Sequence, residues 1–206
     1  MSTPADAATH DWTARARRLS WFTVGYNVVE GVASVLAGGA AGSVALVGFG
    51  LDSFVESLSG MVMIWRFRDA SPHGEHRERR AIRLVGWTFL VLGAYVLFDS
   101  ARKLWLGERP EGTVLGIVIT VVSLMVMPAL YVAKQRVARR LGSRSLAADA
   151  RQTLACMGMS VGVLLGLLLN RLAGFWQADP LVGIVIALLL FREGREALTK
   201  GTVCSC

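Results

Sequence analysis

Residues 43–65 decide the fold class, and they read SVALVGFGLDSFVESLSGMVMIW. A helix of this length extends about 34 Å at 1.5 Å per residue, which is enough to cross the ~30 Å hydrocarbon core of a bilayer. Its only charged residues are Asp52 and Glu56, and their spacing of four places both on one helix face. Because a carboxylate inside a bilayer is costly, this stretch predicts a membrane helix with a functional polar face.

The composition of the whole chain agrees with a membrane protein. Of the 206 residues, 53% are hydrophobic and only 18% are charged, and the mean hydropathy is +0.49. Soluble domains are nearer one quarter charged, and a small one has a large surface to cover. We therefore predict an all-α, six-helix polytopic membrane protein, with a polar arm at 1–18, a membrane domain at 19–198 and a tail at 199–206. The expected spans are 19–38, 43–65, 82–105, 114–133, 149–170 and 179–198.

The positions of Lys and Arg predict the orientation of the chain. Seventeen of them fall in the N-terminal arm, the second and fourth connections (from Arg66 and from Lys134) and the tail, whereas only four lie on the opposite side. Cytosolic loops are enriched in Lys and Arg, so we expect both termini in the cytosol. The arm has no apolar core and is not expected to be a cleaved signal peptide. Topology thus explains the net charge of +7 without a nucleic-acid partner.

Polar residues inside the expected spans predict a site near the bilayer midplane. Gln152 and Cys156 repeat the four-residue spacing of Asp52 and Glu56, and Glu30 lies in the first span. Counting from the flanking arginines puts Glu30, Glu56 and Cys156 at one depth, roughly 15 to 18 Å from the cytosolic side. Asp52 lies just beyond that level and Gln152 just before it. Such an oxygen-rich set with one sulfur is suited to a divalent cation.

Each of these residues also has a purely structural interpretation. Asp52 and Glu56 could hydrogen-bond between helices, and Glu30 could belong to a buried polar network. Gln152 could join helices by hydrogen bonding, and Cys156 could pack as a small hydrophobic residue. On the opposite face of the fifth span, Gly158, Gly162 and Gly166 predict close helix packing. The site and the packing interpretations both remain open from the residues alone.

Several motifs resemble the cation diffusion facilitator (cation efflux) family. Residues 42–46, GSVAL, followed by Asp52 and Glu56, resemble the second transmembrane helix of that family, where two metal ligands have the same spacing. Residues 148–156, ADARQTLAC, look like its fifth helix, ADxLHxxxD, and residues 176–181, WQADPL, resemble its entry to the sixth helix. The resemblance implies that Asp52, Glu56, Gln152 and Cys156 occupy the positions of the family's ligands.

This sequence also departs from the family pattern. Gln152 and Cys156 stand where the family has His and Asp, Glu56 stands where it has Asp, and Phe49 replaces an earlier Asp. The cytosolic metal-binding domain that usually follows the sixth helix is missing from this sequence. The expectation is therefore a short, divergent member with an altered set of ligands, joined by Glu30.

The resemblance implies a proton-coupled secondary transporter of divalent metal, working as a homodimer in the inner (cell) membrane. Zn²⁺ is the preferred cargo, with Cd²⁺, Co²⁺, Mn²⁺ and Fe²⁺ as alternatives, and no other cofactor is expected. The sequence has no nucleophile triad, phosphate loop or ATP motif, so we do not expect an enzyme. The competing interpretation is a membrane scaffold or metal sensor that does not transport. Two further pairs, His73 with His76 and Cys204 with Cys206, are either additional metal ligands or solvated residues.

Overall fold

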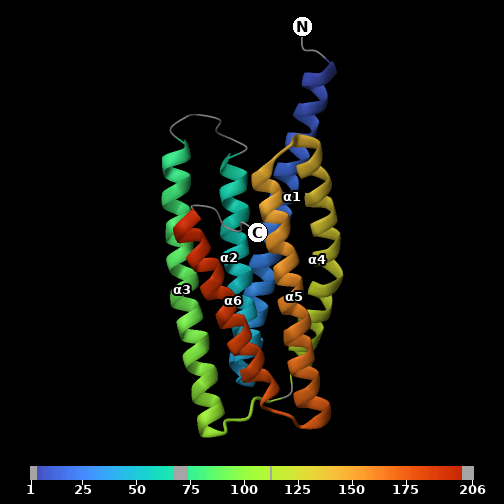
Figure 1. Cartoon of the computed structure of the whole chain (residues 1–206). Coiled ribbons are helices and arrows are strands. Elements are labelled where there is room, and N and C mark those ends of the chain that lie inside the picture. The colour runs from blue at the N-terminus through green and yellow to red at the C-terminus, as the bar shows by residue number, and fades with distance from the viewer. Residues whose placement is uncertain (1–3, 67–73, 112, 201–206) are drawn as a thin grey trace.

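The structure is a computed structural model that describes residues 4–66, 74–111 and 113–200, and within these it contains six α-helices (Figure 1). Each predicted span lies in one helix to within a residue, which confirms the all-α fold class; no strand occurs in the described ranges. The helices are α1 (Pro4–Ala41), α2 (Val44–Arg66), α3 (Gly74–Leu106), α4 (Val114–Leu141), α5 (Arg144–Ala173) and α6 (Ala178–Lys200).

The six helices run alternately up and down, so that α1 begins and α6 ends at the same end of the bundle (Figure 1). The most extensive contacts are those of α1 with α2, α3 with α6 and α4 with α5. Helix α2 also contacts α3, α5 and α6. The helix that carries Asp52 and Glu56 therefore occupies the centre of the bundle, where its polar face meets other helices instead of the outer surface.

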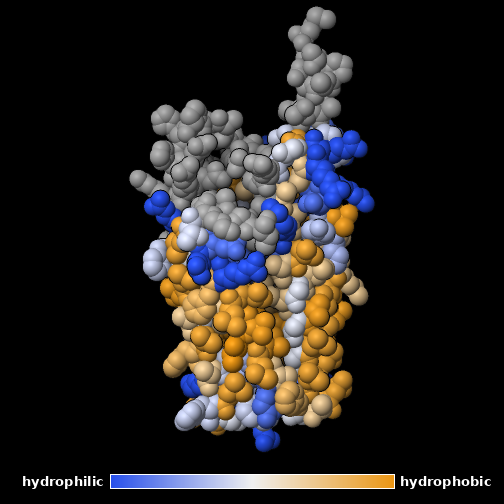
Figure 2. Space-filling model, viewed as in Figure 1, coloured by the Kyte–Doolittle hydropathy of each residue, from blue (hydrophilic) through white to orange (hydrophobic). Residues whose placement is uncertain are grey.

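The surface and interior are distributed as in a membrane protein. On α1, the outward side chains of Val29 and Leu36 are 70% and 68% exposed, whereas Asn27 and Glu30 are 0% and 4% exposed. Figure 2 shows a broad apolar belt across the bundle, with hydrophilic residues gathered mainly at the upper end. An apolar outside around polar interior groups is stable in lipid, and it would be an aggregation liability in water.

Length and composition alone identify three helical stretches that could cross a membrane: Val44–Ile64, Val114–Leu141 and Asp149–Ala173. The other three helices, α1, α3 and α6, have 38, 33 and 23 residues. They are long enough to span ~30 Å. Their described residues, however, carry more charge or are less hydrophobic than those of α2, α4 and α5. Their place beside the apolar helices in one bundle supports the six-span interpretation.

One assignment from the sequence is wrong. Lys134 was expected in a cytosolic connection after a span ending at residue 133, but α4 continues to Leu141 and Lys134 is 0% exposed. It lies on the inner face of α4 because it continues a buried stripe with steps of three and four residues. The stripe consists of Gly116, Thr120, Ser123, Met127, Leu130, Lys134 and Val137.

Side-chain caps fix the end of the bundle that lies opposite the start of α1. The Ser43 hydroxyl accepts a hydrogen bond from Leu46 N at 3.1 Å, as an N-cap of α2 does. Asp179, in the first turn of α6, accepts from Val44 N at 2.9 Å and from the Ser43 hydroxyl. Lys103 Nζ donates to Gly42 O at 2.8 Å. The GSVAL and ADPL segments therefore form one cap that ties α6 to the start of α2.

Glycines bring α1 and α2 close together beside the polar interior. A Cβ on Gly31 would lie 2.9 Å from Gly50 O, and a Cβ on Gly50 would lie 2.8 Å from Ser34 Cβ. A side chain at either position would force the two helices apart. This close crossing places the residue next to Gly31, which is Glu30, against the polar face of α2.

Of the three glycines predicted to form a packing ridge on α5, two face α6. A Cβ on Gly166 would lie 3.3 Å from the Val182 side chain, and one on Gly162 would lie 3.7 Å from it. Gly158 is exposed, and a Cβ there would meet nothing within 4 Å. The ridge prediction therefore holds for Gly162 and Gly166 and fails for Gly158.

Candidate metal centre

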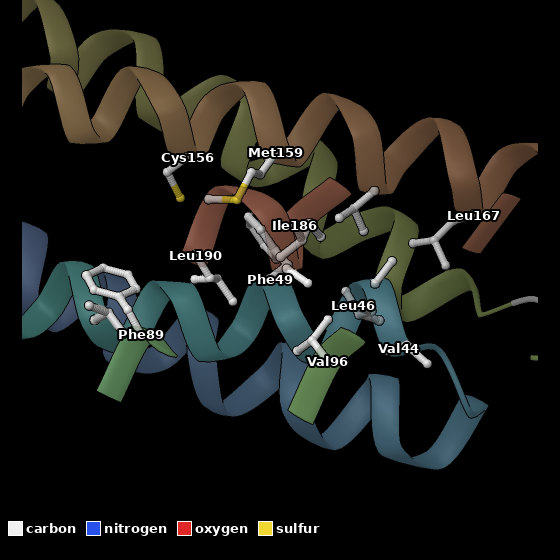
Figure 3. Close-up of a cluster of buried hydrophobic side chains, with 14 of the residues drawn as sticks. Val44, Leu46, Phe49, Phe89, Val96, Cys156, Met159, Leu167, Ile186 and Leu190 are labelled. Atoms are coloured by element: carbon white, nitrogen blue, oxygen red, sulfur yellow. The ribbon is translucent and has the colours of Figure 1, made fainter. Parts of the chain in front are cut away.

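The predicted polar face of α2 is buried against α5. Asp52, Glu56 and Cys156 are 5%, 0% and 1% exposed. Cys156 projects from α5 into a cluster of buried side chains that includes Phe49 of α2 and Ile186 of α6 (Figure 3). Glu30 and Gln152 are each 4% exposed, so all five residues that the sequence assigned to one site are buried inside the bundle.

Glu30 enters this group from α1 and is held by hydroxyls. Tyr26 donates to Glu30 Oε1 and Ser53 of α2 donates to Glu30 Oε2, both at 2.9 Å. A second hydroxyl pair joins α4 to α5, with Ser123 Oγ 3.1 Å from Ser160 Oγ. Neutral hydroxyl donors from α1 and α2 thus satisfy both oxygens of Glu30.

Glu56 has a different environment, because a buried cation lies beside it. Lys134 Nζ is 3.7 Å from Glu56 Oε1 and 2.9 Å from Asp149 Oδ2. The ammonium also donates to Thr153 Oγ1 at 2.9 Å, and the Thr153 hydroxyl donates to Glu56 Oε1 at 2.6 Å. All four side chains are 2% exposed or less. This network joins α2, α4 and α5 through charge-assisted bonds, which are stronger than neutral ones.

Gln152, another predicted ligand, is buried without hydrogen bonds. It is 4% exposed, and neither its amide oxygen nor its amide nitrogen has a hydrogen-bond partner in the described part of the chain. It stands one helical turn from Cys156 on the same buried face of α5. A buried amide without partners is costly, so Gln152 retains its capacity to accept or donate a bond inside the bundle.

Within the ranges that the structure describes, no three His, Cys, Asp or Glu side chains are grouped closely enough to hold a metal ion. Coordination by Asp52, Glu56 and Cys156 would therefore require these side chains to come closer together than they lie here. Glu56 Oε2 has no hydrogen-bond partner among the described residues. This oxygen therefore retains its capacity to accept a hydrogen bond or bind a cation.

Three members of the network were missed as functional candidates: Lys134, Asp149 and Thr153. For Lys134 the signal was present in the sequence, since it falls in register with Thr120, Ser123 and Met127 on one face of α4. Asp149 lies at the beginning of the expected fifth span, where a charge is ordinarily solvated. Its burial arises from tertiary packing against α4, which no single-helix pattern displays.

Two further residue pairs, His73 with His76 and Cys204 with Cys206, are candidate accessory metal ligands. His73, Cys204 and Cys206 lie outside the described residues, and the side chain of His76 is likewise not described. Whether either pair binds metal stays a prediction.

Comparison with known proteins identifies the family. Residues 20–203 match the cation efflux transmembrane domain. Transmembrane protein 163 from Xenopus laevis is 24% identical over 190 residues, covering 91% of this chain and 68% of that protein. The cation-efflux pump FieF from Shewanella oneidensis is 26% identical over 169 residues, covering 78% of this chain and 56% of that protein. An uncharacterized transporter from Methanocaldococcus jannaschii is 25% identical over 172 residues, covering 80% and 60%.

This chain thus spans between about half and two thirds of the length of these relatives. The match nevertheless includes all six helices, from the middle of α1 to the end of α6. It confirms the resemblance drawn from the GSVAL, ADARQTLAC and WQADPL segments, and it supports cation transport as the class of activity. The chain belongs to the cation efflux transmembrane domain family.

Proposed function

We propose that this chain is a secondary transporter that moves a divalent metal cation across the inner (cell) membrane, with Zn²⁺ as the preferred cargo. The observation that carries the proposal is the burial of Asp52, Glu56, Cys156 and Glu30 inside the apolar bundle. Carboxylates buried in a membrane domain are costly, and they mark ion pathways more often than packing contacts. A divalent ion would offset their mutual repulsion.

Asp52, Glu56 and Cys156 are the proposed ligands, with Gln152 or Glu30 assisting. A thiolate favours borderline and soft ions such as Zn²⁺ and Cd²⁺, whereas carboxylates also accept Mn²⁺ and other harder ions. Proton exchange follows from the same chemistry, because carboxyl and thiol ligands lose their protons to bind metal and regain them on release. The proposal includes no enzymatic reaction, and it assigns the working form to a homodimer with both termini in the cytosol.

One observation favours a second candidate function, a membrane scaffold or metal sensor that does not transport. The network of Glu56, Thr153, Lys134 and Asp149 links three helices through buried ion pairs and hydrogen bonds. Polar groups of this kind can serve only to hold transmembrane helices together. A transporter needs the carboxylate charge to bind the cation, whereas a scaffold needs only the hydrogen bonds. A substitution that removes the charge and keeps the hydrogen bonds therefore separates the two functions.

Metal flux into proteoliposomes, followed with an encapsulated Zn²⁺ indicator, tests the proposal. Wild-type protein should give Zn²⁺ flux above protein-free vesicles, and Asp52→Asn should reduce it by about 100-fold or more, beyond the 10- to 100-fold typical of residues that merely support a ligand. Asparagine keeps the shape and hydrogen bonding of aspartate, so a scaffold would tolerate it. Glu108→Gln, which removes a surface carboxylate, is the matched control.

Unchanged flux in Asp52→Asn would exclude this carboxylate as a ligand. Wild-type protein that is correctly inserted but gives no Zn²⁺, Cd²⁺ or Mn²⁺ flux would instead favour the scaffold or sensor.

A further inference from the structure

Lys134 is the least expected charged residue of the bundle, and no part of the proposed transport cycle uses it. Its ammonium is 0% exposed and lies 3.7 Å from Glu56 Oε1, a proposed metal ligand. A lysine is almost never buried this completely unless its charge is compensated. Here two carboxylates and one hydroxyl surround the ammonium, so the charge is maintained inside the protein.

The network gives the ammonium two carboxylate partners of unequal closeness. Asp149 Oδ2 is 2.9 Å away and forms a direct ion pair, whereas Glu56 is reached at 3.7 Å and through the Thr153 hydroxyl. If Glu56 turned away to bind another cation, Lys134 would keep Asp149 and Thr153. The ammonium can therefore release Glu56 without becoming an unpaired buried charge, which would be strongly destabilising.

We propose, on the basis of the proposed function, that Lys134 is a tethered cation that occupies Glu56 in the metal-free protein and sets which ions can displace it. A metal ion that takes Glu56 competes with a positive charge that the protein already supplies. A monovalent ion such as Na⁺ offers Glu56 no greater charge than the ammonium does. A divalent ion offers twice the charge, so it can displace Lys134 onto Asp149.

This role makes Lys134 a specificity-determining residue. Asp149 is the carboxylate that keeps the ammonium paired when Glu56 binds the metal ion. The two residues form one ion pair, yet they act on Glu56 in opposite directions. Neutralising Lys134 removes the competitor, so the divalent ion binds more tightly. Neutralising Asp149 removes the alternative partner, so the ammonium stays on Glu56 and the divalent ion binds more weakly. A pair that only held α4 to α5 would give losses at both positions.

The test is equilibrium Zn²⁺ binding to the purified full chain in detergent, measured by competition with a fluorescent chelator. Lys134→Gln should lower the Kd for Zn²⁺ by about 10-fold or more, since a unit charge within 4 Å of a ligand is removed. Asp149→Asn should raise it by a comparable factor. Arg136→Gln removes the same charge from an exposed position on the same helix, and screening should leave the Kd within about 2-fold.

A second readout separates specificity from packing. Na⁺, exchanged for choline at constant ionic strength, should compete with Zn²⁺ in Lys134→Gln and not in the wild type. Thermal unfolding and size-exclusion profiles check that each variant is folded, and Lys134→Met supplies a neutral, unbranched replacement if glutamine is not accommodated.

The outcomes distinguish this inference from the function on which it rests. A wild-type protein that binds no Zn²⁺ would overturn both. Wild-type binding together with weaker Zn²⁺ binding in both the Lys134 and the Asp149 variants, and no Na⁺ competition, would overturn the tethered-cation role alone.

Discussion

Glu30 and Glu56 are two buried glutamates in one bundle, and the protein treats them differently. Glu30 on α1 accepts hydrogen bonds from the hydroxyls of Tyr26 and Ser53. Glu56 on α2 has Lys134 beside it and keeps one oxygen, Oε2, without a hydrogen-bond partner among the described residues. Neutral hydroxyl donors hold the carboxyl group of Glu30, whereas a charged ammonium group lies beside Glu56. Burial alone therefore does not identify a cation ligand.

The two glutamates also differ in how free their carboxyl oxygens are to bind an ion. Glu30 has its oxygens occupied by neighbours, and the close crossing at Gly31 and Gly50 fixes its position. Glu56 and Asp52 are buried on one face of α2, which contacts α5, the helix that carries the buried Cys156. The proposed metal site therefore gives Glu56 the role of a ligand and Glu30 a supporting role.

The largest expected effect comes from exchanging each glutamate for glutamine in the flux assay. Glu56→Gln should abolish Zn²⁺ flux, with a loss of about 100-fold or more, because it removes a ligand charge. Glu30→Gln should reduce flux by about 10-fold, since an amide still accepts from Tyr26 and Ser53 and a supporting residue typically contributes 10- to 100-fold. Equal losses in both variants, measured at matched amounts of inserted protein, would abolish the distinction between the two glutamates.

A smaller effect is expected far from both glutamates, at the cap that joins α6 to α2. Asp179→Ala leaves Val44 N and the Ser43 hydroxyl without their acceptor, so it should destabilise the folded protein by about 1–2 kcal/mol. Asp179→Asn keeps an acceptor oxygen and should lose less. Thermal unfolding in detergent measures both.

The affinity for Zn²⁺ should be unchanged in either Asp179 variant. A clear loss of Zn²⁺ affinity in either variant would show that the cap and the midplane site are coupled. The site would then have to include residues at this end of the bundle as well as those of α2 and α5.

Most of the fold could be predicted from the sequence, because each apolar run is long and each lies between charged or glycine-containing connections. The buried polar face of α2 could be predicted from the spacing of Asp52 and Glu56, and depth counting gave Cys156 and Glu30 as interior residues, which the structure buries. Lys134 was assigned to a loop, since a lysine at the end of an apolar run ordinarily reaches the interface. Its partner Asp149 could not be found from a helical pattern, because contact between α4 and α5 is a tertiary property.

The most direct test of the central claim, that Asp52, Glu56 and Cys156 together bind a divalent cation, is the X-ray absorption spectrum of the Zn²⁺-loaded protein. The account predicts a first shell of oxygen ligands with one sulfur at about 2.3 Å, and loss of that sulfur in Cys156→Ser with the oxygens retained. A wild-type shell that contains no sulfur, or one that is identical in Cys156→Ser, would contradict it.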